Sequence, residues 1–317
     1  MKIPDELNQA IEEQIKKFDI KILKKDAQNL SDRYLNKERT GNTLLSEDSE
    51  ALAYSIMRMP ATYGAVTTAF NNVLEIINSN NFNTILDIGA GTGAGEWALS
   101  NLIEFEKIIC LERENAMRKL GQNLLKNNSN FQKIEWINKD ITKDELPYAD
   151  VVIVSYVINE LSLDERQKII DKILSIDSKL VLIIEPGTPE SFKNIKQIRK
   201  IAVDSGKFIV APCTTCKECR LPENDWCHST VRVERTKIHK LLKSADLPYE
   251  DEKFSYIAIS KEKYEMAESR ILRHPIIEPG KITLKLCTNG NIEEKIITKK
   301  DKENFKIAKK KKCGDKF

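Results

Sequence analysis

The chain has 317 residues, of which 41% are hydrophobic and 31% charged, so it can bury a sizeable core in one large domain or two moderate ones. It has no apolar run of about 18 residues and no recognisable secretory or transit signal, so we expect neither a membrane span nor export. Seven cysteines, an odd number gathered mostly in one segment, favour a reducing compartment over a disulfide framework, and we expect a cytoplasmic protein.

Residues 1–80 are expected to be helical. Apolar residues in LNQAIEEQIKKFDI recur with a period of 3.6, and the same pattern continues from Ser46 to Asn78. Ser46 is a candidate N-cap, and Pro60 predicts a helix boundary or a kink near Met59.

From residue 82 to residue 210, short apolar runs rich in β-branched residues alternate with helical stretches. The runs are TILDIGAG, KIICLERE, IEWINKD, ADVVIVSY and KLVLIIEPG. This alternation predicts a doubly wound α/β domain with a mostly parallel sheet. We expect four segments: helices at 1–80, the α/β domain at 81–208, a cysteine-rich region with C-terminal strands at 209–300, and a basic tail at 301–317.

The basic tail is the last part of a lysine-rich end. From Lys281 onward there are 12 lysines against five acidic residues, although the net charge of the whole chain is only +3. Such a block is compatible with a solvated, mobile end or with a contact to a phosphate backbone.

A glycine-rich turn gives the sharpest small-molecule signal. In LDIGAGTGAGEWAL, a strand that ends near Asp87 leads into Gly89, Gly91 and Gly93 and then into a helix. Glycines at such a turn let the backbone approach a ligand closely. The spacing resembles motif I of class I S-adenosylmethionine-dependent methyltransferases, which have a Rossmann-like fold, and fits a G-K-[ST] phosphate loop poorly.

Two acidic residues follow this motif at strand ends. Glu112 lies about 20 residues past the glycines, where a carboxylate can accept hydrogen bonds from ribose hydroxyls. Asp140 ends the third strand, where methyltransferases of this class contact the adenine amino group. Each could instead be an ordinary surface carboxylate. NAD is the rival ligand, but all three histidines follow the α/β segment, which disfavours a dehydrogenase.

The loop after the fourth strand, where such enzymes place catalytic groups, reads VVIVSYVINEL. Ser155 and Tyr156 are polar groups in this loop, and Ser155 is a candidate for cofactor binding. The N-P-P-[YF] turn typical of base amino-group methylation is absent, and we assign no catalytic residue. The Pro-Cys pair in APCT resembles the nucleophile of cytosine methyltransferases, but it follows the fifth strand and lies among other thiols, which disfavours that role.

Four cysteines in 15 residues, Cys213, Cys216, Cys219 and Cys227, indicate a metal or cluster site. Zinc is the usual metal for such a group, but the spacing does not form two C-x2-C knuckles. Three close cysteines with a distant fourth are typical of iron–sulfur sites, and Cys287 is the candidate for the fourth ligand.

Several segments, in this order, resemble one known family. They are RMPATYGAV, LDIGAGTGAGEWAL, SYVINEL, EPGTPESF, DWCHSTVRVERTKIHK, LPYEDEKFSYIAIS and LKLCT. Over residues 45–310 the chain is similar to the ribosomal small-subunit-associated methyltransferase-like proteins, which comprise the mitochondrial small-subunit assembly factor and its bacterial relatives.

This resemblance implies an S-adenosylmethionine-binding domain, a structural [4Fe-4S] cluster and action on rRNA of the assembling small subunit. The family pattern C-x5-C-x7-C plus L-C-T selects Cys213, Cys219, Cys227 and Cys287, with Cys216 as a possible alternate. It also implies a monomer off the ribosome, in the cytoplasm or, in a eukaryote, the mitochondrial matrix. Two other readings stay open: a non-catalytic rRNA-binding assembly factor, and a zinc-containing methyltransferase of a protein or small molecule.

Overall fold

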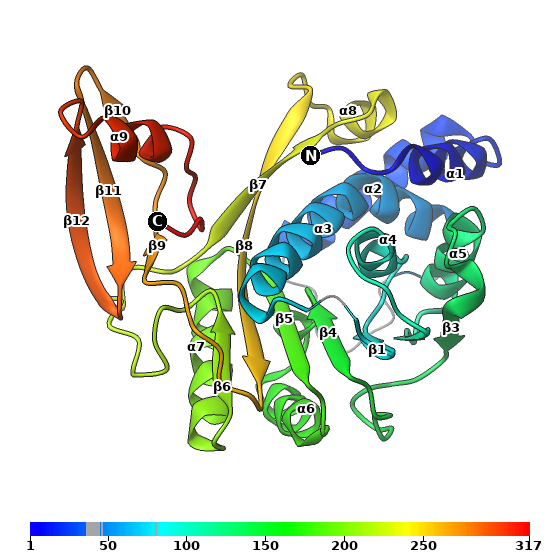
Figure 1. Ribbon diagram of the computed structural model, residues 1–317. Helices are drawn as coiled ribbons and strands as arrows, with labels where there is room; N and C mark the ends of the chain where they lie inside the picture. Colours follow the sequence, from blue (N-terminus) through cyan, green and yellow to red (C-terminus); the bar gives the residue numbers. More distant parts are fainter. Residues whose placement is uncertain (36–44, 46, 80) are drawn as a thin grey trace. The chain divides into compact units, whose positions relative to one another are not determined.

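The computed structural model describes residues 1–35, 45, 47–79 and 81–317 (Figure 1). The chain forms two compact units that interleave along the sequence. Unit 1 comprises residues 1–68, 80–181 and 231–252, and unit 2 comprises residues 69–79, 182–230 and 253–317. From the sequence we expected four consecutive segments instead, and this division stays a prediction.

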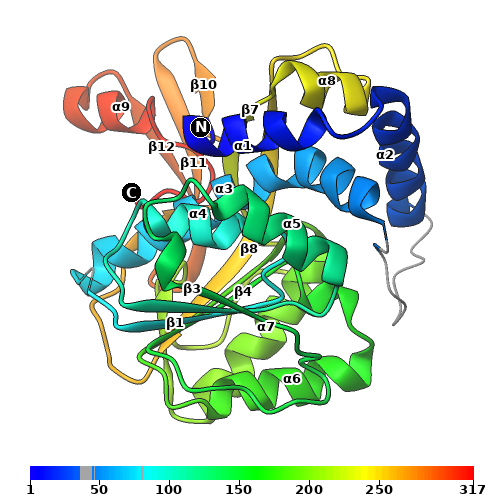
Figure 2. The ribbon, with the colours of Figure 1, turned by 90° about the vertical axis from the view of Figure 1, so that its right-hand side faces the viewer.

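Unit 1 contains parallel strands covered by helices. The strands are β1 (Thr84–Ile88), β2 (Lys107–Leu111), β3 (Ile134–Ile137) and β4 (Val151–Ser155), which lie in the order β3-β2-β1-β4. Helix α4 (Ala94–Ser100) connects β1 to β2, α5 (Asn115–Leu125) lies between β2 and β3, and α6 (Leu163–Ser175) follows β4. Figure 2 shows α4 and α5 on one face of these strands and α6 on the other. Because both faces are covered, β1 and β4 are almost continuously apolar and buried.

The sheet continues through β5 (Leu180–Pro186), which begins in unit 1 and ends in unit 2, to β8 (Tyr249–Ser260) and β6 (Phe208–Ala211). The β6 strand pairs antiparallel to β8, and β7 (Ser229–Glu234) also pairs with β8. The mostly parallel order β3-β2-β1-β4-β5-β8-β6 confirms the predicted α/β fold class.

The N-terminal residues are helical, as predicted. They form α1 (Asp5–Ile15), α2 (Ile20–Leu35) and α3 (Asp48–Ile77). Of the boundary or kink predicted near Met59, the boundary is wrong, because α3 runs through Pro60. Buried residues line this helix along much of its length, and this packing offsets the hydrogen bond that proline cannot make. Ser46, the expected N-cap, lies outside the described residues. No helix among the described residues is both long and apolar enough to cross a membrane.

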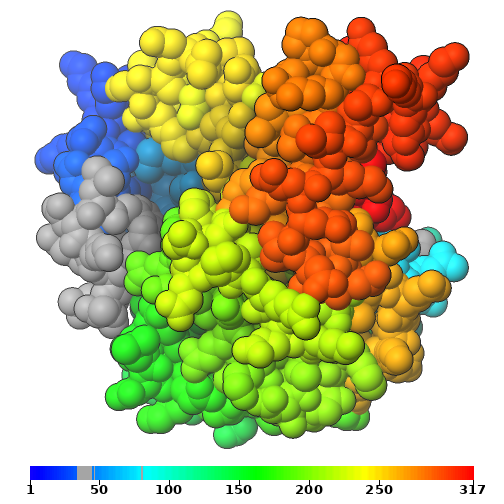
Figure 3. Space-filling view, turned by 90° about the vertical axis from the view of Figure 1, so that its left-hand side faces the viewer, coloured from blue at the N-terminus to red at the C-terminus, as the bar shows by residue number. Residues whose placement is uncertain are grey.

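Unit 2 adds a small antiparallel sheet. It consists of β9 (Ser269–Ile271), β10 (Ile276–Glu278), β11 (Lys281–Thr288) and β12 (Asn291–Thr298), with α7 (Pro189–Asp204) and α9 (Lys302–Ala308) elsewhere in the unit. Alternate residues of β11, namely Ile282, Leu284 and Leu286, are buried in its core. Figure 3 shows one face of this unit, where the orange-to-red C-terminal residues lie beside the yellow-green loop that follows β6.

The basic C-terminal segment packs on the small sheet, which favours the second of the two alternatives considered for it over a loose end. Phe305 of α9 and Phe317 pack against the core of the small sheet. Cys313 is buried, and the Phe317 N–H donates to the Ser269 carbonyl at 3.1 Å. The lysines of this segment stay mostly exposed because apolar residues spaced between them face the sheet.

Candidate functional site

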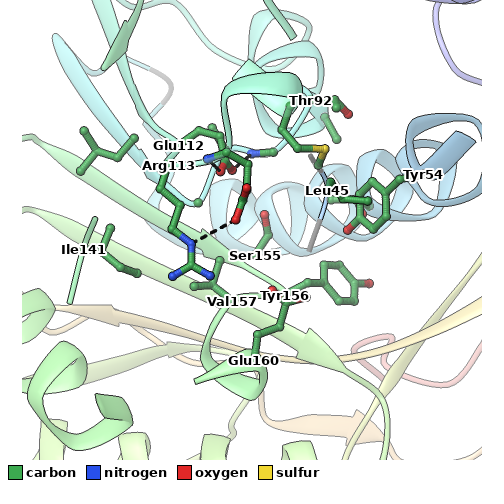
Figure 4. Close-up of a pocket in the computed structure, with 18 of the residues that line it drawn as sticks. Leu45, Tyr54, Thr92, Glu112, Arg113, Ile141, Ser155, Tyr156, Val157 and Glu160 are labelled. Carbon is green, nitrogen blue, oxygen red and sulfur yellow. Dashed lines mark hydrogen bonds and ion pairs between the residues drawn. The ribbon is translucent and has the colours of Figure 1, made fainter. Parts of the chain in front are cut away.

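A cavity of about 170 Å³ opens in unit 1 beyond the carboxyl ends of its parallel strands. Five of the seven predicted cofactor-binding residues line it: Gly89, Gly91, Glu112, Asp140 and Ser155. They follow or end β1, β2, β3 and β4, which explains why residues spread over 67 positions converge. Figure 4 shows Thr92, Glu112, Ser155 and Tyr156 around this cavity.

The glycine-rich turn forms one wall of the cavity. Gly91 has a φ of +59°, a conformation that residues with a Cβ rarely adopt, and its N–H donates to Glu112 Oε2 at 2.9 Å. Gly93 also has a positive φ but lies outside the lining, at the N-cap of α4. A Cβ at Gly93 would lie 3.0 Å from Leu125 Cδ1, so this glycine serves packing between helices.

Glu112 is 8% exposed and is held by the backbone on both oxygens. Oε2 accepts the Gly91 N–H, and Oε1 accepts the Glu114 N–H at 2.8 Å. Burial raises the pKa of Glu112 from 4.5 to about 7, although these two hydrogen bonds act in the opposite direction. Each carboxylate oxygen keeps a second lone pair, so the group can still accept two ligand hydroxyls.

Asp140 lies at the cavity in a tight turn after β3. Its Oδ1 accepts the N–H of Thr142 at 3.0 Å and the hydroxyl of Thr142 at 2.6 Å, and Lys143 Nζ lies 3.2 Å from Oδ2. Partial burial acts to raise the pKa of Asp140, but these contacts lower it overall. Asp140 is therefore a fixed, ionised acceptor at neutral pH.

Asp87 lies outside the cavity lining, although the motif made it a candidate ligand. It is 1% exposed, and neither oxygen accepts an N–H or hydroxyl donor from the described residues. Burial and the neighbouring carboxyl of Glu96 raise the pKa of Asp87 well above its usual range. Glu96 also accepts from Cys110 Sγ at 2.9 Å. Asp87 thus belongs to a buried acidic cluster beneath the glycine turn rather than to the cavity.

A contact that sequence reasoning missed lies at Tyr156. This cavity-lining residue has a φ of +62°, a strained conformation for tyrosine, and its hydroxyl donates to Glu252 Oε1 at 2.8 Å. Arg58 Nη2 lies 3.1 Å from the same oxygen, and its guanidinium lies 5.6 Å from the Tyr156 ring centre. Glu252 is 96 residues from Tyr156 and belongs to no local motif, so only the fold reveals it.

A second cavity, of about 60 Å³, lies within unit 2 and brings the predicted thiols together. Its lining includes Cys213, Cys219, Cys227 and Cys287. Cys216 is absent from the lining, and its Sγ instead accepts the Ile209 N–H at 3.4 Å. The arrangement matches the four-cysteine set that the resemblance selected and leaves out the alternate.

The thiol cavity is apolar enough to disfavour free thiolates. Burial raises the pKa of Cys213, although the nearby guanidinium of Arg199 acts to lower it. Burial also raises the pKa of Cys227 well above its usual range, against a lowering effect of Arg270. In the described part of the chain, no three His, Cys, Asp or Glu side chains are spaced as ligands of one metal ion.

Comparison with known proteins identifies the chain. The model of the family described as mitochondrial small ribosomal subunit Rsm22 matches residues 48–317, which is most of the sequence. The chain belongs to the Rsm22 family. This confirms the resemblance to small-subunit-associated methyltransferase-like proteins.

The Rsm22-family chain is similar to the human protein described as "Ribosome assembly protein METTL17, mitochondrial". The two are 22% identical over 268 residues, which cover 78% of this chain and 58% of that protein. The chain therefore spans little more than half the length of this relative.

Among solved structures, the chain is similar to magnesium protoporphyrin IX methyltransferase of Synechocystis with bound SAM. The match has 12% identity, a TM-score of 0.40, and coverage of 75% of this chain and 97% of that one. The precorrin-6y C5,15-methyltransferase of Geobacter metallireducens matches with 16% identity and a TM-score of 0.42, over 62% of this chain and 87% of that one.

Proposed function

We propose that this Rsm22-family protein binds S-adenosylmethionine in the unit 1 cavity and acts on rRNA during assembly of the small ribosomal subunit. The observation that carries the first part is the convergence of Gly91, Glu112, Asp140 and Ser155, from four consecutive strand ends, on one cavity. The ribosomal part is supported by membership of the Rsm22 family and by the description of the human relative as a ribosome assembly protein.

The residues present fit the cofactor. Glu112 would accept hydrogen bonds from the ribose hydroxyls, since each of its oxygens retains acceptor capacity after binding one backbone N–H. Asp140 would accept the adenine amino group, and the glycine turn would admit the rest of the ligand close to the backbone. Bound S-adenosylmethionine would supply an electrophilic methyl group. The protein's part in methyl transfer would be to orient donor and acceptor.

We further propose that Cys213, Cys219, Cys227 and Cys287 hold a structural [4Fe-4S] cluster. Support comes from the family resemblance, which selects these four cysteines, and from the fact that all four line one cavity in unit 2. Three of these residues lie on the loop after β6, and Cys287 lies on β11, so the centre would clamp that loop to the small sheet. The chain would act as a monomer off the ribosome, in the cytoplasm or, in a eukaryote, the mitochondrial matrix.

Calorimetry against S-adenosylmethionine tests the cofactor site. Glu112→Ala should weaken binding strongly, whereas Glu106→Ala, which removes an exposed carboxylate outside the cavity lining, should preserve it. Unchanged affinity in Glu112→Ala would remove Glu112 from the site.

Crosslinking to cellular RNA with sequencing tests the partner, and enrichment of small-subunit rRNA is expected. A random RNA profile would contradict the ribosomal part. Incubation of immature subunits with methyl-labelled donor then separates a methyltransferase, which labels rRNA, from a non-catalytic assembly factor, which does not.

Metal analysis of anaerobically purified protein tests the cluster. We expect a brown protein with iron and sulfide in equal amounts. A colourless protein with stoichiometric zinc would replace the cluster with the zinc alternative.

A further inference from the structure

The thiol cavity is also lined by two buried arginines. Arg199, on α7, is 7% exposed, and Arg270, on β9, is 3% exposed. Arginine is almost never this deeply buried without a partner of opposite charge, because removing a guanidinium from water is costly. Two such groups on a small cavity therefore need an explanation.

Backbone carbonyls supply the acceptors for both guanidinium groups. Arg199 Nη2 donates to the carbonyls of Thr215, at 2.7 Å, and of Lys217, while Arg199 Nε has no hydrogen-bond partner among the described residues. Arg270 Nε donates to the Pro212 carbonyl at 2.9 Å, and Arg270 Nη1 donates to the Gly314 carbonyl at 3.0 Å. These bonds satisfy donors but do not neutralise charge.

No carboxylate of the described chain compensates the two cations. Neither arginine has a carboxylate oxygen within 4.0 Å in the residues that the structure describes, in contrast to Arg273, which pairs with Asp225 in the same unit. Glu218 also lines the cavity, but its side chain is exposed to solvent. The cavity is also lined by Lys196 and Arg220, which are partly or fully exposed to solvent. The two buried positive charges thus face a cavity whose other buried or half-buried groups include four thiols, His228 and Tyr256 but no carboxylate.

The positions of the arginines match those of the thiols. Arg199 lies near enough to Cys213, and Arg270 near enough to Cys227, for each guanidinium to act on the neighbouring sulfur. Four thiolates around a doubly charged metal core form a dianion, and two guanidinium groups carry the opposite charge. The charges would then cancel within the cavity.

We propose that Arg199 and Arg270 are the counter-charges of a dianionic tetrathiolate centre in this cavity and that they raise its reduction potential. The inference rests on the cluster in the proposed function. Adding an electron makes the centre more negative, so nearby cations stabilise the reduced form more than the oxidised form. The arginines would therefore favour reduction and help to retain the centre.

The test uses the full-length protein purified anaerobically. Arg199→Gln removes one charge, and Arg199→Lys keeps it while changing the hydrogen bonds. Lys200→Gln is the matched control, because Lys200 lies on the same helix but is exposed and pairs with Asp204. Iron and sulfide are measured for each chain, and the one-electron reduction by dithionite is titrated and followed by electron paramagnetic resonance.

We expect Arg199→Gln to lower the equilibrium constant for reduction about tenfold. For a one-electron couple this lowers the reduction potential by about 59 mV. Arg199→Lys should stay near the wild-type potential, and Lys200→Gln should match wild type. If Arg199→Gln loses iron while Arg199→Lys retains it, the charge requirement is also supported.

Equal potentials and equal iron content in wild type and Arg199→Gln would overturn the counter-charge role and leave the cluster intact. Equal loss of iron from Arg199→Gln and Arg199→Lys, with circular dichroism showing a folded chain, would assign Arg199 to hydrogen bonding rather than charge and would also overturn it. Wild-type protein without iron and sulfide would instead remove the cluster, and the inference with it.

Discussion

The ionisation of Glu112 should make affinity for the proposed cofactor depend on pH. Burial raises its pKa from 4.5 to about 7. Ionising Glu112 in the folded chain therefore costs about 3 kcal/mol more than in the unfolded chain, at about 1.4 kcal/mol for each pKa unit. Between these two pH values the folded chain holds a proton on Glu112 that the unfolded chain has released. Folding stability therefore falls as pH rises from 4.5, and the full loss is reached above about pH 7. Ribose hydroxyls donate to the ionised form, so ligand binding should release this proton.

The expected magnitude follows from the fraction of ionised Glu112. With a pKa of about 7, about a tenth of the groups are ionised at pH 6 and about nine tenths at pH 8. Affinity for S-adenosylmethionine should therefore rise about tenfold between these pH values, if the protonated form binds far more weakly.

Calorimetry at pH 6, 7 and 8, in buffers of different ionisation enthalpy, measures both affinity and proton release. The amino group of the ligand also titrates near the upper end of this range, so the comparison with Glu112→Ala isolates the protein group. Glu106→Ala, which removes an exposed carboxylate outside the cavity lining, is the control that should keep the wild-type response. The same affinity ratio between pH 8 and pH 6 in wild type and Glu112→Ala would refute the role of Glu112.

Three further outcomes follow from the structure. Cys287→Ser should lose most bound iron and Cys216→Ser should keep it, because Cys287 lines the thiol cavity and Cys216 does not; equal loss would contradict the ligand set. Gly121→Ala should lower the free energy of unfolding by about 1–3 kcal/mol, because the added Cβ would lie 2.4 Å from Trp136 Cη2. Thermal melts measure this, and an unchanged melting temperature would show that the Trp136 ring can move. Changing the lysines at 309–312 to Gln should reduce the salt slope of RNA binding by up to about 3, whereas changing four lysines within 16–25 should not.

The fold could be predicted because its determinants are local. Each central strand is a short run of β-branched residues, and each is followed by a helical pattern, which permits few arrangements other than a mostly parallel sheet. The cavity residues could be proposed for the same reason: Glu112, Asp140 and Ser155 follow or end successive strands, whose carboxyl ends meet at one edge of the sheet.

Features that depend on packing between distant segments were not predictable. The side chain of Glu252 reaches Tyr156 and Arg58 only because β8 runs through the sheet, and nothing near residue 252 in sequence signals it. Pro60 lies inside a helix because burial outweighs its local preference. The C-terminal lysines suggested a loose end, but Phe305 and Phe317 fold that segment onto the small sheet.

The thiol cavity does not depend on metal alone for its assembly. Thr214 Oγ1 accepts the Gly290 N–H at 3.0 Å and lies 3.4 Å from Cys287 Sγ, which joins the loop after β6 to the turn that follows β11. Asp225 binds Lys285 of β11 at 2.8 Å and pairs with Arg273. Apart from the contact to Cys287 Sγ, these interactions hold the loop against β11 through groups that no cluster would use. The entropy of closing the long connection between Cys227 and Cys287 is thus offset by the protein's own contacts, so a bound centre would add rigidity to a cavity that is already formed.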